Sequence, residues 1–320
     1  MSAQTIDFDH GISAIDTGFV RPQFDASHLI IHNGRAAFID VGSNHSIARL
    51  LDALRVRGLG VDAVDWVILT HVHLDHAGGA GLAMQSLPNA KLVVHPRGAR
   101  HMIDPSALIA GATAVYGAEE IARSYGTLVP VPAARVVEAP EGHIVDLAGR
   151  ELRCLDTPGH ARHHISIRDA ASHAFFTGDT FGLSYREFDT EQGAFILPTS
   201  TPVQFEPDAL KASIARMLEH EPQQMFLTHY SRVGDVPRLA QDLHTQIDAM
   251  VAIATAHASD ADRHARIAGD LAALYTSRAQ AHGCTFDAAQ VHELLAMDIE
   301  LNTQGLEVWL DKQRKPQPPP

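Results

Sequence analysis

Residues 70–76, which read Thr-His-Val-His-Leu-Asp-His, constrain this chain more than any other segment. They place three imidazoles and one carboxylate within six consecutive positions, directly after a short apolar run. Imidazole and carboxylate donors together suit zinc, iron or manganese. His71 and His73 alternate and so project to one side of an extended segment, while Asp75 and His76 precede a glycine pair that permits a sharp turn. The segment therefore predicts ligands for two neighbouring metals.

Three isolated residues further along the chain have the same setting. His160, Asp179 and His229 each follow a short apolar, β-prone run, and strand ends are where rigid scaffolds present chemistry. Taken singly, each could be an ordinary turn or capping residue. A histidine-rich solvated loop is also an alternative for the first cluster, because the chain has 21 histidines. The recurrence of metal-capable residues in one setting favours a metal site.

The combined pattern resembles that of the metallo-β-lactamase-fold hydrolases, over roughly residues 10–235. The matching segments are Asp40 in Phe-Ile-Asp-Val-Gly, the His71/His73/Asp75/His76 block, His160 in Thr-Pro-Gly-His, Asp179 in Thr-Gly-Asp, and His229 in Leu-Thr-His. The resemblance implies that one metal is held by His71, His73 and His160, and a second by Asp75, His76 and His229. It also implies that Asp179 bridges the two metals and that Asp40 supports the ligands without being one.

Two further residues are candidates for substrate chemistry. His164 lies four residues after His160, where glyoxalase II-like members also carry a histidine, and either a catalytic or a structural role is open to it. Tyr185 could supply the phenol that lactonases direct at a carbonyl oxygen, although its spacing from Asp179 is longer than theirs. A packed aromatic is the alternative for Tyr185.

The chemistry that these residue types permit agrees with the resemblance. Two cations roughly 3.5–4 Å apart, bridged by one carboxylate, can hold a hydroxide and lower the pKa of its parent water to about 7. One metal can also polarise the substrate carbonyl. The sequence has no Gly-x-Ser-x-Gly elbow, and neither Cys154 nor Cys284 lies in a nucleophile motif. Asp75 could orient the hydroxide and pass a proton to the leaving group.

Composition limits the classes of function. A formal net charge of −13 argues against a general nucleic-acid binder, which needs clustered Lys and Arg. The first residues lack the basic start and apolar run of a signal peptide, and no apolar run approaches the ~20 residues of a membrane span. We therefore expect a cytoplasmic protein without nucleic-acid or membrane partners. Its two distant cysteines fit a reducing compartment.

The order of predicted elements divides the chain into a catalytic domain, residues 1–235, and a helical unit, residues 236–315. Strands and helices alternate in the first part, beginning with a hairpin around Asn33-Gly34 and a helix over 46–57. The resemblance implies a four-layer αββα sandwich with this helical unit appended, an α/β (α+β) fold. Residues 97–134 interrupt the strand pattern. They could form a lid over the site, or an insertion that only packs against the rest of the domain.

The C-terminal helices are expected to pack against the parent domain or a second subunit, as in a homodimer, and the proline-rich residues 316–320 to form a disordered tail. The favoured function is a hydrolase with two divalent metals, zinc before iron or manganese, acting on the thioester or lactone carbonyl of a small molecule. The C-terminal Arg/Lys pattern that grips glutathione is not evident. A phosphodiesterase of small substrates, or a metal-binding regulator acting through the C-terminal helices, is the alternative.

Overall fold

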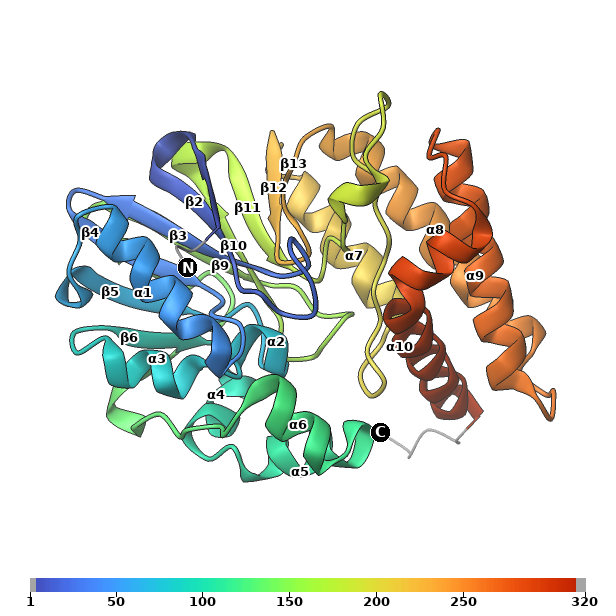
Figure 1. The fold of residues 1–320 in the computed structure, drawn as a ribbon, viewed down its shortest axis with the longest axis horizontal. Coiled ribbons are helices and arrows are strands. Elements are labelled where there is room, and N and C mark those ends of the chain that lie inside the picture. Colours follow the sequence, from blue (N-terminus) through green and yellow to red (C-terminus); the bar gives the residue numbers. More distant parts are fainter. Residues whose placement is uncertain (1–3, 315–320) are drawn as a thin grey trace. The chain divides into compact units, whose positions relative to one another are not determined.

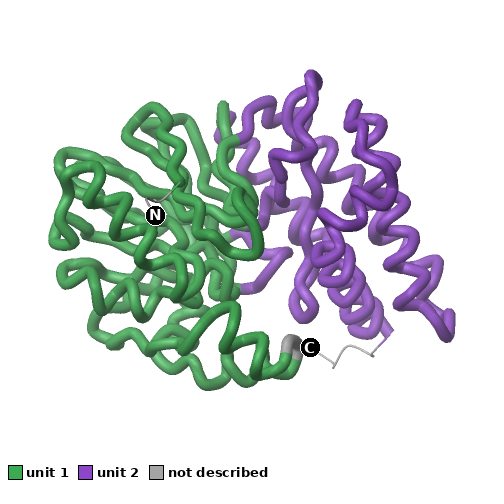
Figure 2. The backbone as a smooth tube through the Cα atoms, viewed as in Figure 1, with its two compact units in different colours: residues 1–156, 163–178, 222–232 green, residues 157–162, 179–221, 233–320 purple. Residues whose placement is uncertain are grey.

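The computed structural model describes residues 4–314, apart from the side chains of residues 115 and 116. The chain forms two compact units, which Figure 2 shows in green and purple. Unit 1 comprises residues 1–156, 163–178 and 222–232, and unit 2 comprises residues 157–162, 179–221 and 233–320. The predicted disordered tail, 316–320, lies outside the described residues, and the predicted division near residue 235 stays a prediction.

The first sheet of unit 1 has its strands in sequence order (Figure 1). Its first four strands are antiparallel and its last four are parallel. The strands are β1 (Thr5–Phe8), β2 (Ile12–Asp16), β3 (Ala26–His32), β4 (Arg35–Ile39), β5 (Val64–Ile68), β6 (Lys91–Val94) and β7 (Val136–Glu138). Because β4 and β5 run parallel, the chain leaves both of them at the same edge of the sheet.

The second sheet has the order β13-β12-β11-β10-β9-β8. Strands β8 to β11 are antiparallel, while β11 and β12 are parallel. The strands are β8 (Ile144–Leu147), β9 (Arg150–Asp156), β10 (Ile165–Asp169), β11 (Ala174–Gly178), β12 (Gln224–Leu227) and β13 (Ser231–Val233). The parallel pair again brings two strand ends to one edge of a sheet.

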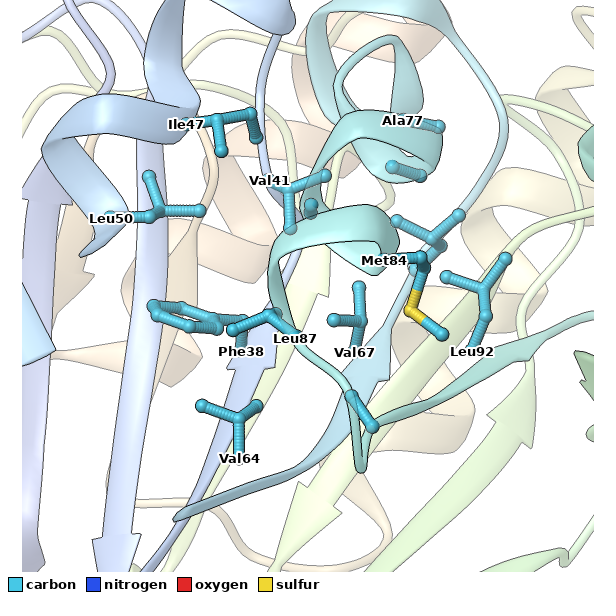
Figure 3. Packing of buried hydrophobic residues seen from close by; sticks show 14 of the residues in the cluster. Phe38, Val41, Ile47, Leu50, Val64, Val67, Ala77, Met84, Leu87 and Leu92 are labelled. Atoms are coloured by element: carbon cyan, nitrogen blue, oxygen red, sulfur yellow. The ribbon is translucent and has the colours of Figure 1, made fainter. Parts of the chain in front are cut away.

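Alternating side chains of the first sheet build two separate cores in unit 1. Ile39 and Ile68 face the second sheet, where they pack with Ile167 and other apolar side chains. Their neighbours Phe38 and Val67 face the other way, into a core that helices cover (Figure 3). This alternation is the period-2 pattern of strands that are buried on both faces.

Helices close the outer face of the first sheet. Helix α1 (Ile47–Val56) buries Leu50 and Leu54 there, and α3 (Ala80–Ser86) buries Met84. The expected hairpin is present, with His32 paired to Arg35 across a turn in which Asn33 and Gly34 have positive φ. The predicted helix over 46–57 is also confirmed.

The segment 97–134 contains three helices of unit 1, which are α4 (Pro96–Ile103), α5 (Ser106–Tyr116) and α6 (Ala118–Tyr125). Helix α4 packs closely on the metal motif, because a Cβ at Gly98 would lie 2.8 Å from Val72 Cγ1. Whether the segment moves as a lid stays a prediction. The short helix α2 (Leu74–Ala77) lies within the motif itself.

The α-helices of unit 2 are α7 (Pro207–Leu218), α8 (Val236–Ala256), α9 (Arg263–Ala281) and α10 (Ala288–Arg314). Leu243 of α8, Leu271 of α9 and Leu295 of α10 are fully buried. In the described part of the chain no helix is both long and apolar enough to cross a membrane.

Candidate metal centre

The tight turn that carries Asp75 and His76 brings both side chains beside His229, which follows the end of β12. Donor atoms of these three residues all lie within 4.8 Å of one another. Nε2 of His76 lies 3.6 Å from Oδ2 of Asp75, and Nε2 of His229 lies 3.4 Å from the same oxygen. Two buried imidazoles and one partly exposed carboxylate form a set of donors that suits a divalent metal.

The outer nitrogens of both histidines are fixed by protein acceptors. Nδ1 of His76 donates to Oδ2 of Asp40 at 2.8 Å, and Nδ1 of His229 donates to the carbonyl oxygen of Phe24 at 2.9 Å. Each ring therefore presents its Nε2 lone pair toward Asp75. This is the arrangement in which a metal-ligating histidine donates its other N–H to a neighbouring acceptor, so the residues present fit a metal ion.

Asp40 connects the ends of three strands of unit 1. Its Oδ2 accepts hydrogen bonds from Thr70 Oγ1 at 2.8 Å, Thr228 Oγ1 at 3.0 Å and His76, while its Oδ1 accepts from the backbone N of Thr70. Asp40 is 1% exposed and has a φ of +53°, in the left-handed region. Its position matches the supporting carboxylate that the resemblance implies, although the role itself stays a prediction.

His71 and His73 form a second pair of donors in unit 1. Nε2 of His71 lies 2.8 Å from Nδ1 of His73. The Thr70 hydroxyl gives its proton to Asp40 and lies 3.1 Å from Nδ1 of His71, so it accepts a hydrogen bond from that nitrogen. The proton on Nδ1 leaves the His71 Nε2 lone pair facing His73.

His160 and Asp179 form a pair of donors in unit 2. Nε2 of His160 lies 3.2 Å from Oδ2 of Asp179, and Nδ1 of His160 contacts the carbonyl oxygen of Thr199 at 3.3 Å. A Cβ at Gly159 would lie 2.3 Å from the backbone of Leu210, so only glycine permits this approach. Asp179 directly follows Gly178, the last residue of β11.

His164 is completely buried in unit 1, between a ligand candidate and a strand end. Its ring stacks on that of His71 with centroids 4.9 Å apart, and a Cβ at Gly178 would lie 2.6 Å from its Nε2. The neighbouring His163 lies against His73, with ring centroids 5.7 Å apart. His164 therefore has the surroundings of a residue that supports His71, and a catalytic role for it stays a prediction.

Tyr185 lies in unit 2 with 2% of its surface exposed. Its hydroxyl donates to Oδ1 of Asp298 on α10 at 3.2 Å. These surroundings are those of the packed aromatic that was the alternative, while the predicted contact with substrate is untested.

Two threonines and one carboxyl group near these donors were missed by the sequence interpretation. Thr70 and Thr228 both support Asp40, and both stand in the tripeptide Leu-Thr-His. That repeat was a signal available in the sequence. Asp25 accepts a hydrogen bond from Thr17 Oγ1, and burial raises its pKa to about 7, partly offset by His229.

A family model for the metallo-beta-lactamase superfamily matches residues 20–230. The chain belongs to this superfamily. Its fold class is thus confirmed as the metallo-β-lactamase α/β sandwich with C-terminal helices, and the superfamily consists of metal-dependent hydrolases.

The chain is also similar to individual proteins whose names place them in this superfamily or describe a hydrolase. A metallo-beta-lactamase fold-containing protein of Sulfurisphaera tokodaii is 27% identical over 237 residues, which cover 72% of this chain and 82% of that protein. A hydroxyacylglutathione hydrolase of Acidiphilium cryptum is 27% identical over 238 residues, covering 73% and 74% of the two chains. A metallo-beta-lactamase family protein of Thermus thermophilus superposes with a TM-score of 0.67 at 18% identity, covering 95% and 94%.

Proposed function

We propose that this protein hydrolyses the thioester or lactone carbonyl of a small molecule with two divalent metal ions, of which zinc is the favoured kind. The observation that supports the proposal most strongly is the group formed by Asp75, His76 and His229. Both imidazoles are held at Nδ1 and turn Nε2 toward the carboxylate. Holding an imidazole ring in one orientation costs conformational entropy. Histidines held at Nδ1 in this way are typical metal ligands.

A second ion would be held by the two remaining donor pairs. His71 and His73 belong to unit 1, and His160 and Asp179 belong to unit 2. His71 and His73 follow the end of β5, and Asp179 directly follows the end of β11. The resemblance assigns His71, His73 and His160 to this ion and Asp179 as the bridge between the ions, and imidazole and carboxylate donors suit a divalent metal.

Two ions would supply Lewis-acid activation of water and of the substrate carbonyl. The protein itself supplies Asp75, whose side chain is 24% exposed while that of His76 is fully buried. The Asp75 carboxylate is therefore the member of this group that solvent and substrate reach, and it would carry a proton toward the leaving thiolate or alkoxide. Cys154 is disfavoured as a nucleophile because its burial raises the pKa of the thiol to about 12.

The preference for a thioester comes from a relative. The protein of Acidiphilium cryptum is named a hydroxyacylglutathione hydrolase, and it shares 27% identity over most of both chains. A lactone has an electrophilic carbonyl carbon like that of a thioester, so the same metal centre could act on it. A phosphodiester is the alternative substrate, because a two-metal site can also activate a phosphoryl group, and it serves as the competing substrate in the test.

The test combines elemental analysis with turnover of thioesters, lactones and bis-p-nitrophenyl phosphate by metal-replete protein. We expect about two ions per chain, and hydrolysis of a carbonyl substrate that chelation abolishes. His229→Ala should retain about one ion, whereas the exposed control His264→Asn should retain two. A maximum of one ion per chain, or turnover confined to the phosphodiester, would refute the proposal.

A further inference from the structure

Asp25 is a buried carboxyl group that receives only part of the hydrogen bonding it can accept. It lies directly before β3 and is 1% exposed. Its Oδ2 accepts a 2.8 Å hydrogen bond from the Thr17 hydroxyl, whereas its buried Oδ1 has no hydrogen-bond partner in the described part of the chain. Asp169, another buried carboxylate of unit 1, accepts at both oxygens from the Arg150 guanidinium and also from the Ser172 hydroxyl. Buried charges are normally paired in this way or lie at a metal, so Asp25 lacks the usual compensation.

The residues on both sides of Asp25 are bonded to the end of β12 that carries His229. The carbonyl oxygen of Phe24 accepts the hydrogen bond from Nδ1 of His229, and the backbone N of Ala26 donates to the carbonyl oxygen of Thr228 at 2.9 Å. The ring of Phe24 also meets the ring of His229 edge-to-face, with centroids 5.3 Å apart. Asp25 is therefore fixed between two residues that position a ligand candidate.

The carboxyl group of Asp25 lies within electrostatic range of the Asp75 group, which consists of Asp75, His76 and His229. Burial has the largest influence on Asp25 and raises its pKa to about 7. After burial, the charges of His229 and His76 lower this pKa, and the charge of Asp75 raises it. The donor atoms of the Asp75 group lie within 4.8 Å of one another, and those of Asp25 are not among them. Asp25 therefore lies beside this group and is not one of its candidate ligands.

We propose that the Asp25 carboxylate stabilises a divalent cation in the Asp75 group from outside the set of ligands, an inference that rests on the proposed function. Two neutral imidazoles and one carboxylate carry a single negative charge, whereas the cation carries two positive charges. A further carboxylate in a buried position offsets the remaining positive charge, because buried charges are screened little. The cation in turn compensates the buried charge of Asp25, which the Thr17 hydroxyl offsets only in part.

This role predicts opposite effects of Asp25→Asn on the metal-free and the metal-bound protein. Without metal, the neutral amide removes a buried charge that the fold compensates poorly, so stability should be kept or raised. With metal, the lost charge should weaken binding by the roughly 10–100-fold that is typical of groups supporting a metal site. A carboxyl group with a structural role alone would show the reverse pattern, namely a less stable fold and unchanged metal affinity.

The experiment titrates the metal-free full-length chain with Co²⁺ against a competing chelator at a pH of about 8, where Asp25 is ionised, and follows the visible absorption of bound Co²⁺. Asp25→Asn should raise one of the two dissociation constants by about tenfold or more and the other by less than about threefold. In a His229→Ala background the same substitution should leave the remaining constant unchanged. The urea denaturation midpoint of the metal-free variant should stay or rise. The matched control Asp169→Asn should lower that midpoint and keep both constants.

Three results would overturn the inference. Unchanged Co²⁺ constants in Asp25→Asn, with two ions bound by the wild-type chain, would refute it and leave the proposed function intact. Equal weakening of both constants, or a lower denaturation midpoint of the metal-free variant, would assign Asp25 a structural role. A wild-type chain that never binds two Co²⁺ ions would refute the proposed function, and the inference with it. If Asp25→Asn does not fold, Asp25→Ser takes its place, and the same outcomes decide.

Discussion

The carboxylate of Asp40 accepts a 2.8 Å hydrogen bond from Nδ1 of His76, and both side chains are buried almost completely. The same oxygen of Asp40 accepts from the hydroxyls of Thr70 and Thr228. One carboxylate thus fixes an imidazole and also ties the end of β4 to the residues that follow β5 and β12.

Asp40→Asn is expected to lower the free energy of unfolding of metal-free protein by roughly 3–5 kcal/mol, because an amide cannot accept all the hydrogen bonds that Asp40 accepts. Chemical denaturation in chelator measures this change. Asp65→Asn, which removes a partly exposed ion pair with Arg35, is the matched control and should cost under about 1 kcal/mol. Equal losses of unfolding free energy in the two variants would show that the buried hydrogen bonds of Asp40 stabilise the fold no more than an exposed ion pair does.

Substitutions of two carboxylates should separate metal binding from turnover. Asp179→Ala is expected to lower both, because its Oδ2 lies 3.2 Å from Nε2 of His160 in a buried position. Asp75→Asn should reduce kcat by about 100-fold or more, with a smaller loss of metal, since a positioned proton carrier contributes about 10²–10⁴-fold. Elemental analysis and kinetics on the same samples provide the comparison. Complete loss of metal from both variants would contradict the role proposed for Asp75.

Tyr185→Phe distinguishes a packed aromatic from a substrate contact. Because the hydroxyl donates to buried Asp298, its loss should cost about 1–3 kcal/mol of stability. Turnover should change less than threefold if the phenol serves only unit 2. A tenfold or greater fall in kcat with unchanged stability would instead establish Tyr185 as a catalytic residue.

His28 should make unfolding dependent on pH. Burial lowers its pKa from 6.5 to about 3, and its ring meets the rings of Phe176 and Phe226 edge-to-face. The folded state therefore favours neutral imidazole, so the contribution to stability is complete above pH 6.5 and is lost as the pH falls toward 3. Between pH 6.5 and 5 the loss should be about 2 kcal/mol. His28→Leu should remove this slope in denaturation curves, and an unchanged slope would point to other groups.

Local sequence patterns predicted much of the scaffold. The Asn33-Gly34 hairpin and helix α1 appear where turn chemistry and helical spacing put them. Strands β1 and β2 were missed, since residues 5–16 are short and irregular in pattern. Helix α5 was missed because its residues are apolar without helical periodicity. A segment that is apolar on all sides has no amphipathic pattern from which a helix and its buried face could be predicted.

The donors near the candidate centre were predictable by residue type, but their mutual positions were not. The spacing of His71 to His76 identified ligand candidates, while the hydrogen bond from His229 to Phe24 joins residues 205 positions apart. No local pattern encodes a pairing of that range. The dual use of Asp40 by Thr70 and Thr228 likewise depends on the order of strands in two sheets.

The positive φ of Asp40 has a consequence for the variation that its position can accept. Asparagine, aspartate and glycine enter the left-handed region at little cost, and most other side chains do not. Of these three, only aspartate offers two anionic oxygens to the surrounding donors. The residue at position 40 must therefore meet two independent requirements: it must tolerate a left-handed backbone conformation, and it must carry a negative charge. Asparagine would keep the backbone shape but leave Thr70, Thr228 and His76 without their shared anionic acceptor.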